Sequence, residues 1–390
     1  AKGWQVDGAF EEATTVLEAI KLIVAAGRAS LSLNDGRYGV VLDQDQTAAG
    51  PAQLFTPRNV RNLTVTRAFI EYPHALKVQF LNEDERYQED EVIVYDDDHN
   101  LDGSPELMVE NHDGGTAVLT MTWGPIDEVE GVDSVVDLND MSVVDPGLYT
   151  VDAEASTVTL NAGTWGAGEA RWRVTYWAVR AEATLFESMT APFIVTKDQA
   201  WRYGRYLMAV ARLRPRRIEF GADWEHLRCQ RGDMIALQHY VPLLGLAAGA
   251  RVTGFVLTDP EDPESDPIGI VIDDKWEIES AKTYAITLRF SDGEVRYLPV
   301  DSSTPAITDE FVFIETPLPT SSGGREIRVG DLCAFGETDL VTRDVLVSSI
   351  HPESNLETRL VCVDHAPEVH QAEEYPIPEF DPGITQPPPY

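Results

Sequence analysis

The chain has 390 residues with a formal net charge of −36 at pH 7, and 43% of its residues are hydrophobic. This length suits about two to four domains, and so negative a charge argues against a surface that grips nucleic-acid phosphates or anionic membranes. Apolar runs fall short of the roughly 18 residues that a membrane span needs. The start at Ala1 is polar and unlike a secretory signal peptide, and the lack of an initiator Met indicates processing or a piece of a longer polypeptide.

The first predicted elements are a helix over 10–27 and a hairpin. Apolar residues at helical spacing form a stripe on the helix, and Gly27 is a suitable stop. Arg28 to Leu42 is typical of two strands around Asn34-Asp35-Gly36, because these turn residues tolerate positive φ. We expect 1–50 to form a small α/β piece.

Two sets of short strands follow. Residues from Val60 to Tyr95 alternate as strands do, and so do residues from Leu101 to Val179, where Gly, Asp and Asn separate the strands. The hairpin pattern within the second set favours an inserted β-sandwich-like module over 101–179. We expect this module to interrupt a discontinuous β domain made of 51–100 and 180–245.

The segment 196–251 is the most informative part of the chain. Thr196 and Gln199 have the spacing of a capping box, and the predicted helix over 196–214 must end before Pro215. The sequence RRIEF then indicates a strand, Arg231-Gly232-Asp233 a turn, and Met234 to Tyr240 a second strand.

The remaining residues also favour β structure. Short strands from Leu257 to Val363 predict an OB-like β-barrel over 246–370, followed by a proline-rich linker over 371–390. Gly330-Asp331 stands before an apolar strand as Gly232-Asp233 does, which indicates similar barrel edges. The expected fold class is mainly β with minor α (α+β), as small barrels and sandwiches with a few helices.

One acidic stretch is a candidate metal site. Asp98-x-Asn100-x-Asp102-Gly103 matches the first half of a calcium loop, but the twelfth position is Val109 rather than a Glu. An acidic turn is the favoured interpretation, and we predict no metal ligands.

Arginines are concentrated in one short window. They either form a nucleic-acid patch or pair with carboxylates of neighbouring domains or subunits, and the acidity of the chain favours pairing. The Arg231-Gly232-Asp233 tripeptide is interpreted as a turn and not as an adhesion motif. The arginines in question are Arg202, Arg205, Arg212, Arg214, Arg216 and Arg217.

Other reactive side chains match no catalytic or cofactor-binding pattern. The odd number of cysteines argues against a disulfide framework, fits assembly in a reducing cytoplasm, and favours small buried residues on strands. The histidines lack metal-ligand spacing. The tryptophans could form a sugar-binding platform, but packing in a core or hairpin is the favoured interpretation. These residues are Cys229, Cys333, Cys362, His74, His226, His239, His365, Trp123, Trp165, Trp172 and Trp177.

The order of these elements resembles the host-specificity, or tip-attachment J, proteins of phages with long non-contractile tails. The resemblance lies in the Thr-x-x-Gln-Ala start, the Arg-rich helix, the Gly-Asp turn and the exit Gly249-Ala250-Arg251-Val252. It extends to Phe55-Thr56-Pro57-Arg58-Asn59, to the strand run ending Glu91 to Asp96, and to a closing hairpin at Val345 to Ile350 and Thr358 to Glu368. Residues 101–179 depart from the pattern.

The resemblance implies a structural hub of the tail tip rather than an enzyme, with no catalytic residue and no cofactor. It implies a homotrimer in the virion, assembled in the host cytoplasm, that closes the distal end of the tail tube. Implied partners are other tail-tip or baseplate proteins, the tail tube, the C-terminus of the tape-measure protein, a host receptor bound through other regions, and DNA in transit.

Two other classes of function stay open. The inserted module over 101–179 could bind glycans or a receptor, which would make the chain an adhesin, and an envelope-degrading glycosidase is a third interpretation. The charge of −36 has two explanations, solubility and an acidic conduit that repels DNA phosphates.

Overall fold

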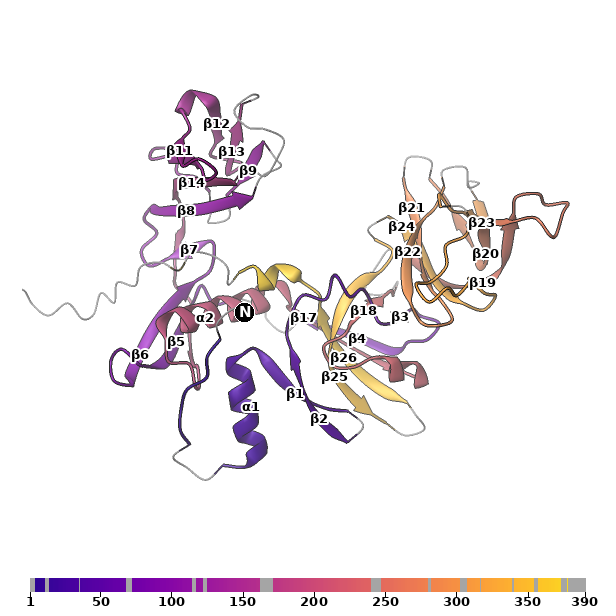
Figure 1. Cartoon of the computed structure of the whole chain (residues 1–390), viewed down its shortest axis with the longest axis horizontal. Helices are drawn as coiled ribbons and strands as arrows, with labels where there is room; N and C mark the ends of the chain where they lie inside the picture. The colour runs from indigo at the N-terminus through magenta and orange to yellow at the C-terminus, as the bar shows by residue number, and fades with distance from the viewer. Residues whose placement is uncertain are drawn as a thin grey trace, which may run out of the picture. The chain divides into compact units, whose positions relative to one another are not determined.

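The predicted fold class is confirmed: the chain is mainly β, with several sheets that include two half-barrels. Two α-helices occur among the described residues (Figure 1). No helix in that part of the chain is long and apolar enough to cross a membrane. The computed structural model describes residues 4–10, 14–34, 36–67, 72–113, 117–121, 125–161, 171–239, 247–279, 282–301, 307–315, 317–338, 340–353, 357–372 and 377.

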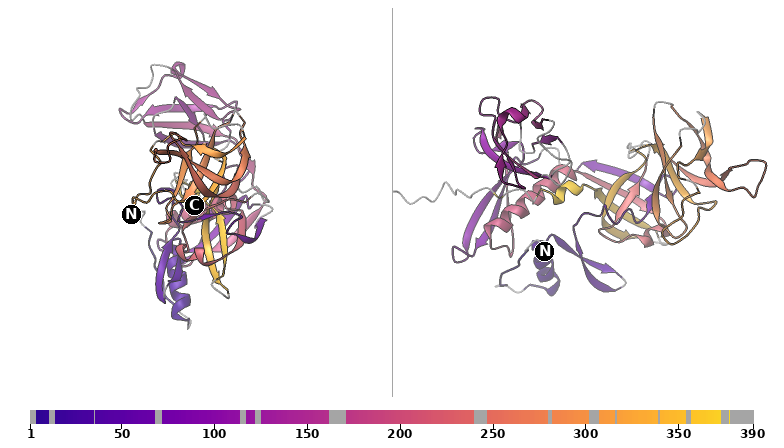
Figure 2. Two further views of the ribbon diagram at one scale, coloured as in Figure 1. Left: turned by 90° about the vertical axis from the view of Figure 1, so that its right-hand side faces the viewer. Right: turned by 45° about the horizontal axis from the view of Figure 1, so that its top comes forward.

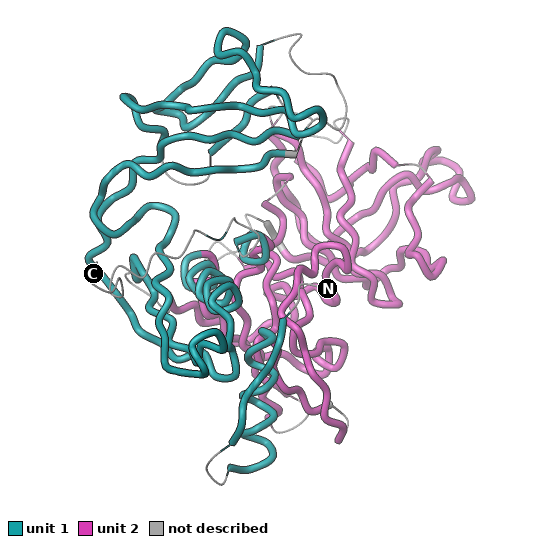
Figure 3. The backbone as a smooth tube through the Cα atoms, turned by 60° about the vertical axis from the view of Figure 1, so that its left-hand side comes forward, with its two compact units in different colours: residues 1–28, 71–212, 368–390 teal, residues 29–70, 213–367 magenta. Residues whose placement is uncertain are grey.

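The chain divides into two compact units, and both are discontinuous in sequence (Figure 3). Unit 1 contains 1–28, 71–212 and 368–390, whereas unit 2 contains 29–70 and 213–367. Each unit therefore combines parts of several of the segments expected from sequence. The linker predicted over 371–390 lies outside the described residues, apart from Gln371, Ala372 and Ile377.

Unit 1 is built around a helix on a small sheet. Helix α2 (Lys197–Leu213) lies along the sheet β16 (Phe186–Thr190), β5 (Ala75–Asn82), β6 (Gln88–Tyr95), as Figures 1 and 2 show. Gly204 allows this close packing, because a Cβ there would lie 2.7 Å from Val94 and 2.9 Å from Val78. Helix α1 (Val16–Ala26) also belongs to this unit.

The region 101–179 forms two sheets of unit 1 that share one core. Its central strand β14 (Arg171–Ala178) places Trp172, Val174 and Tyr176 inward, all fully buried, against residues such as Leu119 and Leu160 of the other sheet. Strands β7 (His99–Asn100) and β15 (Ala181–Glu182) pair in parallel where the chain enters and leaves. The sheets are β11 (Ser142–Val143), β10 (Val132–Asp137), β14 (Arg171–Ala178), β8 (Glu106–Asp113), and β12 (Tyr149–Asp152), β13 (Thr157–Leu160), β9 (Val118–Thr120), with η1 (Pro146–Leu148).

Unit 2 contains two six-stranded sheets and a separate hairpin of β1 (Ala29–Asn34) and β2 (Arg37–Leu42). The first sheet has the order β3 (Leu54–Phe55), β18 (Met234–Leu237), β25 (Arg343–Pro352), β26 (Thr358–Asp364), β17 (Arg216–Ala222), β4 (Arg61–Arg67). The second has the order β22 (Val295–Pro299), β21 (Tyr284–Arg289), β24 (Leu332–Glu337), β19 (Ala247–Leu257), β20 (Pro267–Glu277), β23 (Ile307–Val312).

Several local predictions need correction. Helix α1 begins at Val16 and not near residue 10, because Thr15 and Glu18 form a complete capping box. The second strand of the Gly-Asp unit ends at Leu237, short of the predicted Tyr240. The closing hairpin β25–β26, which we placed in the segment 246–370, pairs with β17 and β18 of the first sheet.

The start of α2 was also predicted only in part. The Thr196 hydroxyl accepts the Gln199 N–H at 3.4 Å, as the capping box requires. The Gln199 side chain, however, bonds the Gln5 backbone, accepting its N–H at 3.1 Å and donating to its carbonyl at 2.8 Å. Gln199 therefore fastens the N-terminal segment of unit 1 to the helix.

Candidate functional site

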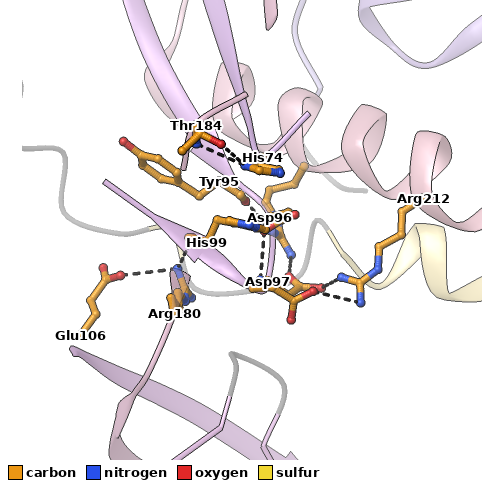
Figure 4. A network of polar contacts seen from close by, with 11 residues as sticks. His74, Tyr95, Asp96, Asp97, His99, Glu106, Arg180, Thr184 and Arg212 are labelled. Atoms are coloured by element: carbon orange, nitrogen blue, oxygen red, sulfur yellow. Dashed lines mark hydrogen bonds and ion pairs between the residues drawn. The ribbon is translucent and has the colours of Figure 1, made fainter. Parts of the chain in front are cut away.

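A network of charged and polar side chains gathers at the base of the inserted module (Figure 4). Arg180, which follows β14, is 6% exposed and lies 3.4 Å from Glu106, which begins β8. It also donates to the carbonyl of His99 at 3.5 Å. Burial lowers the pKa of the Arg180 guanidinium, and the nearby Glu106 carboxylate acts against this. The buried Arg180 side chain therefore connects the segment that leaves the module to the segment that enters it.

Two arginines of α2 complete the network from the helix side. Arg205 has a side chain only 4% exposed, donates to the Tyr95 carbonyl at 2.8 Å and forms an ion pair with Asp97. Arg212 binds the same Asp97 at 3.2 Å and reaches Asp98 at 3.6 Å. Helix α2 therefore holds the loop that leads from β6 into the module.

A pair of histidines lies beside these charges. The rings of His74 and His99 stack with centroids 3.8 Å apart and planes 10° apart. The Thr184 N–H donates to Nδ1 of His74 at 3.2 Å, so that nitrogen must carry a lone pair. His99 in turn places its Nδ1 2.8 Å from Asp96. The arrangement fixes strand ends against one another.

The acidic stretch that resembled half a calcium loop lies in the same region. Asn100 donates to the Ser104 carbonyl at 2.7 Å and accepts the Gly103 N–H. Asp102 accepts the Ser104 hydroxyl at 2.6 Å, and hydrogen bonds from Ser104 lower the pKa of Asp102. Within the described ranges, no three His, Cys, Asp or Glu residues are grouped so that they could hold a metal ion.

Five of the six arginines of the sequence window pair with carboxylates of the same chain, which agrees with the pairing interpretation rather than a nucleic-acid patch. Besides Arg205 and Arg212, three more do so within unit 2. Their ion pairs are Arg214–Asp43 at 2.6 Å, Arg216–Asp364 at 2.9 Å and Arg217–Glu219 at 2.8 Å. These ion pairs hold segments of the same chain together.

The two Gly-Asp turns have the same geometry. Gly232 and Gly330 have φ of 91° and 97°, and each donates its N–H at 2.8 Å to a neighbouring strand, to Val347 and Val252 respectively. The Asp that follows accepts the N–H three residues earlier, at 2.7 Å for Asp233 and 2.8 Å for Asp331. Burial raises the pKa of both carboxyls. The two similar Gly-Asp sequences therefore form the same type of turn, one before β18 and the other before β24.

The matched turns allow a test of backbone strain against steric contact. A Cβ at Gly330 would meet nothing within 4 Å, whereas a Cβ at Gly232 would lie 2.4 Å from Val41. We expect Gly330→Ala to cost about 1–3 kcal/mol through its positive φ alone, and Gly232→Ala to cost more. The free energy of unfolding in urea is the measurement. Val41→Ala should recover part of the loss in the Gly232→Ala background but none with Gly330→Ala, and equal recovery in both would contradict this account.

Other predicted residues occupy structural positions. All three cysteines are free and buried, and burial raises the pKa of Cys229 and of Cys333 to about 12. Cys333 and Cys362 lie on strands as expected, but Cys229 follows the short helix η2 (Trp224–Arg228). Trp172 is buried and cannot offer a sugar platform, while Trp123 and Trp165 lie outside the described residues.

The four histidines singled out in the sequence lie in separate surroundings. His226 lies 2.7 Å from the Asp223 carbonyl and His365 lies 3.5 Å from Asp45. Burial lowers the pKa of His239. Only His74, of the four singled out in the sequence, belongs to the network in Figure 4. Sequence reasoning missed His99 and Arg180, although His99 lies on β7 and Arg180 directly precedes β15, the two short strands where the predicted module begins and ends.

Three of the segments that carry the resemblance noted in the sequence lie in the first sheet of unit 2, whereas α2 and β6 belong to unit 1 and 249–252 lies on β19 of the second sheet. β3 contains Phe55 of the Phe-Thr-Pro-Arg-Asn motif and pairs with β18, the strand after the Gly232-Asp233 turn. The closing hairpin β25–β26 then joins β18 to β17. Comparison of the chain with protein-family models and with curated proteins found no match.

Proposed function

We propose that this chain is a structural hub of a phage tail tip. In this role it forms a homotrimer that closes the distal tail tube, links the tube to receptor-binding parts and opens for DNA ejection. The observation that carries the proposal is the first six-stranded sheet of unit 2, where three sequence-distant parts of the resemblance meet: β3, the strands β17 and β18, and the closing hairpin β25–β26.

The construction of this sheet fits a part that must withstand force. Asp364 is 2% exposed and lies between Arg216 and Arg343, at 2.9 and 2.8 Å, so one carboxylate joins three neighbouring strands. Glu219 likewise contacts both Arg217 and Arg359, at 2.8 and 3.0 Å. Pulling on β17, β25 or β26 is resisted by the neighbouring strands through these charge-assisted bonds as well as the backbone ladder.

The charge of the chain also fits the proposed passage of DNA. Several of the arginines between positions 202 and 217 form ion pairs with carboxylates, while the chain as a whole has a net charge of −36. An anionic wall repels phosphates, so DNA crosses such a conduit without adhering. The proposed location is the distal end of the tail in the virion, after assembly in the host cytoplasm beside other tip proteins and the tape-measure protein.

Oligomeric state tests this proposal directly. One chain has a mass of 43.2 kDa, and static light scattering of the 390-residue chain should give about three times this mass. Images of the assembled tail tip should show threefold symmetry. A monomer in the assembled particle would exclude the hub role.

An adhesin is the second candidate, because the inserted module has its own two-sheet core and exposed apolar side chains. Val129, Met141 and Val143 are 88%, 64% and 69% exposed. A glycan array on the chain, with deletion of 101–179 as the matched variant, separates the two roles. Hits that disappear with the deletion would favour the adhesin. Clearing of peptidoglycan or polysaccharide gels by the chain would instead favour the envelope-degrading glycosidase.

A further inference from the structure

The hairpin β1–β2 has an unusual orientation, because its apolar face is the exposed one. The register pairs Leu33 with Tyr38 and Leu31 with Val40, so these side chains share one face of the ribbon. Leu33, Tyr38 and Val40 are 63%, 73% and 58% exposed, and Leu42 on the same face is 45% exposed. We call this set, Leu31, Leu33, Tyr38, Val40 and Leu42, the outer hairpin face.

The opposite face of the hairpin contacts the rest of unit 2. Val41 lies against Gly232 of the Gly-Asp turn, where it leaves no space for a Cβ. The Arg231 side chain also donates to the Leu31 carbonyl at 3.0 Å. The first Gly-Asp turn therefore holds the hairpin by its other side and presents the outer hairpin face outward.

Helix α1 also has a row of exposed apolar side chains. Val16, Ile20 and Ile23 stand at spacings of four and three, which places them on one helix face. They are 77%, 38% and 40% exposed, and only Ala26 of this helix is buried. The helix row is therefore exposed among the described residues, as are Leu33, Tyr38, Val40 and Leu42 of the outer hairpin face.

Each element needs a partner of the other's kind. An isolated two-stranded ribbon is marginal in water and gains stability by packing against a helix. A helix of 11 residues is likewise marginal, and its stability depends on burying an apolar face. The lengths agree, since the helix extends about 16 Å and a six-residue strand about 20 Å.

Charge favours a second copy of this chain as the source of that partner. Two chains of −36 repel each other over most of their surfaces. Residues 14–42, however, carry two acidic residues (Glu18, Asp35) and three basic ones (Lys21, Arg28, Arg37), a net charge of +1. This is therefore a stretch through which identical copies can approach without strong repulsion.

We infer that the outer hairpin face of one copy binds helix α1 of the next copy, around the ring of the homotrimer. The inference rests on the proposed function, which supplies the trimer. Such a contact is heterologous, because two different surfaces meet, and heterologous contacts close into rings when the rotation allows it.

Substitution at the two faces tests the contact. Val40→Asp and Ile20→Asp should each lower the mass measured by light scattering threefold, to that of one chain, because each places a charge in an apolar interface. Val129→Asp is the matched control, since Val129 is 88% exposed on the inserted module and its substitution should leave the mass unchanged. Circular dichroism melting of each variant reports that the chain itself still folds.

Cross-linking identifies the partner surface. All three natural cysteines are buried, so Ile20→Cys and Val40→Cys chains can be mixed and oxidised. We expect a disulfide-linked pair in the mixture, at least tenfold above either variant alone. A disulfide found only when both substitutions share one chain would place the helix on its own hairpin and overturn the inference. A trimer that survives Val40→Asp would overturn it while leaving the proposed hub intact, whereas a monomeric wild-type chain in the particle would exclude both.

Discussion

Replacement of Arg205 by Ala is expected to destabilise unit 1 by about 3 kcal/mol, because it breaks a buried ion pair from one side. The Arg205 side chain is 4% exposed, whereas its partner Asp97 is 25% exposed. The substitution also removes the donor to the Tyr95 carbonyl and the packing of the guanidinium over Trp201, 5.9 Å from the ring centroid. Asp97 keeps Arg212 as a partner, which places the loss at the low end for buried pairs.

Arg212 supplies the matched control, because it binds the same carboxylate from a position 45% exposed. Arg212→Ala should cost less than about 1 kcal/mol, as exposed ion pairs do. Urea-dependent hydrogen exchange, followed by mass spectrometry on peptides from β6 and α2, separates unit 1 from unit 2. Equal losses for the two variants would show that burial of Arg205 is not what gives the network its strength.

The arginine window illustrates what could be predicted from the sequence. Helix α2 was expected over 196–214 and spans Lys197–Leu213, because its apolar spacing and Pro215 are local signals. The pairing of arginines with carboxylates followed from the charge balance. The identity of the partners did not, since Asp97, Asp43 and Asp364 lie more than 100 residues away in sequence from Arg205, Arg214 and Arg216.

Sheet membership was less predictable for the same reason. Strands β4 and β17 have local apolar alternation and β18 is a short apolar run, but only long-range pairing brings β3, β4 and β25–β26 onto β17–β18. The Gly-Asp turns gave a useful signal, because a positive φ before an apolar strand is encoded by adjacent residues. The capping box at Thr15 was equally local, and its Thr-x-x-Glu spacing was available to correct the start of α1.

The base of the inserted module shows the limit of sequence patterns. The acidic residues near 98–102 suggested either a metal loop or a turn, and the pattern alone favoured the turn. The actual neighbours of this stretch come from segments before and after the module: Arg180 bonds the His99 carbonyl, Arg212 pairs with Asp98, and His74 stacks on His99. A composition rule cannot locate such a junction, because its parts meet only once the two crossings β7 and β15 have paired.

Replacement of Phe335 by Ala is expected to have the largest effect in unit 2. The side chain is fully buried on β24 and stacks on Tyr284 with centroids 5.4 Å apart. It also packs against Phe311 at 4.3 Å and edge-on against Trp276 at 5.6 Å. Loss of a buried Phe costs about 3–5 kcal/mol through lost burial and the cavity that remains, and the aromatic pairs add to this loss.

The consequence should be confined to one unit. Hydrogen exchange of peptides from β21 and β24 should accelerate at lower urea in the Phe335→Ala chain, while peptides from β5, β6 and α2 keep the behaviour of the wild type. Tyr297→Ala is the control on the same sheet, because Tyr297 is 44% exposed and its removal opens no cavity. Phe335→Leu, which retains most of the volume, should fall between the two. If unit 1 instead loses protection in step with unit 2, the two units unfold as one, and the division at residues 28, 70, 212 and 367 does not describe the chain's cooperative parts.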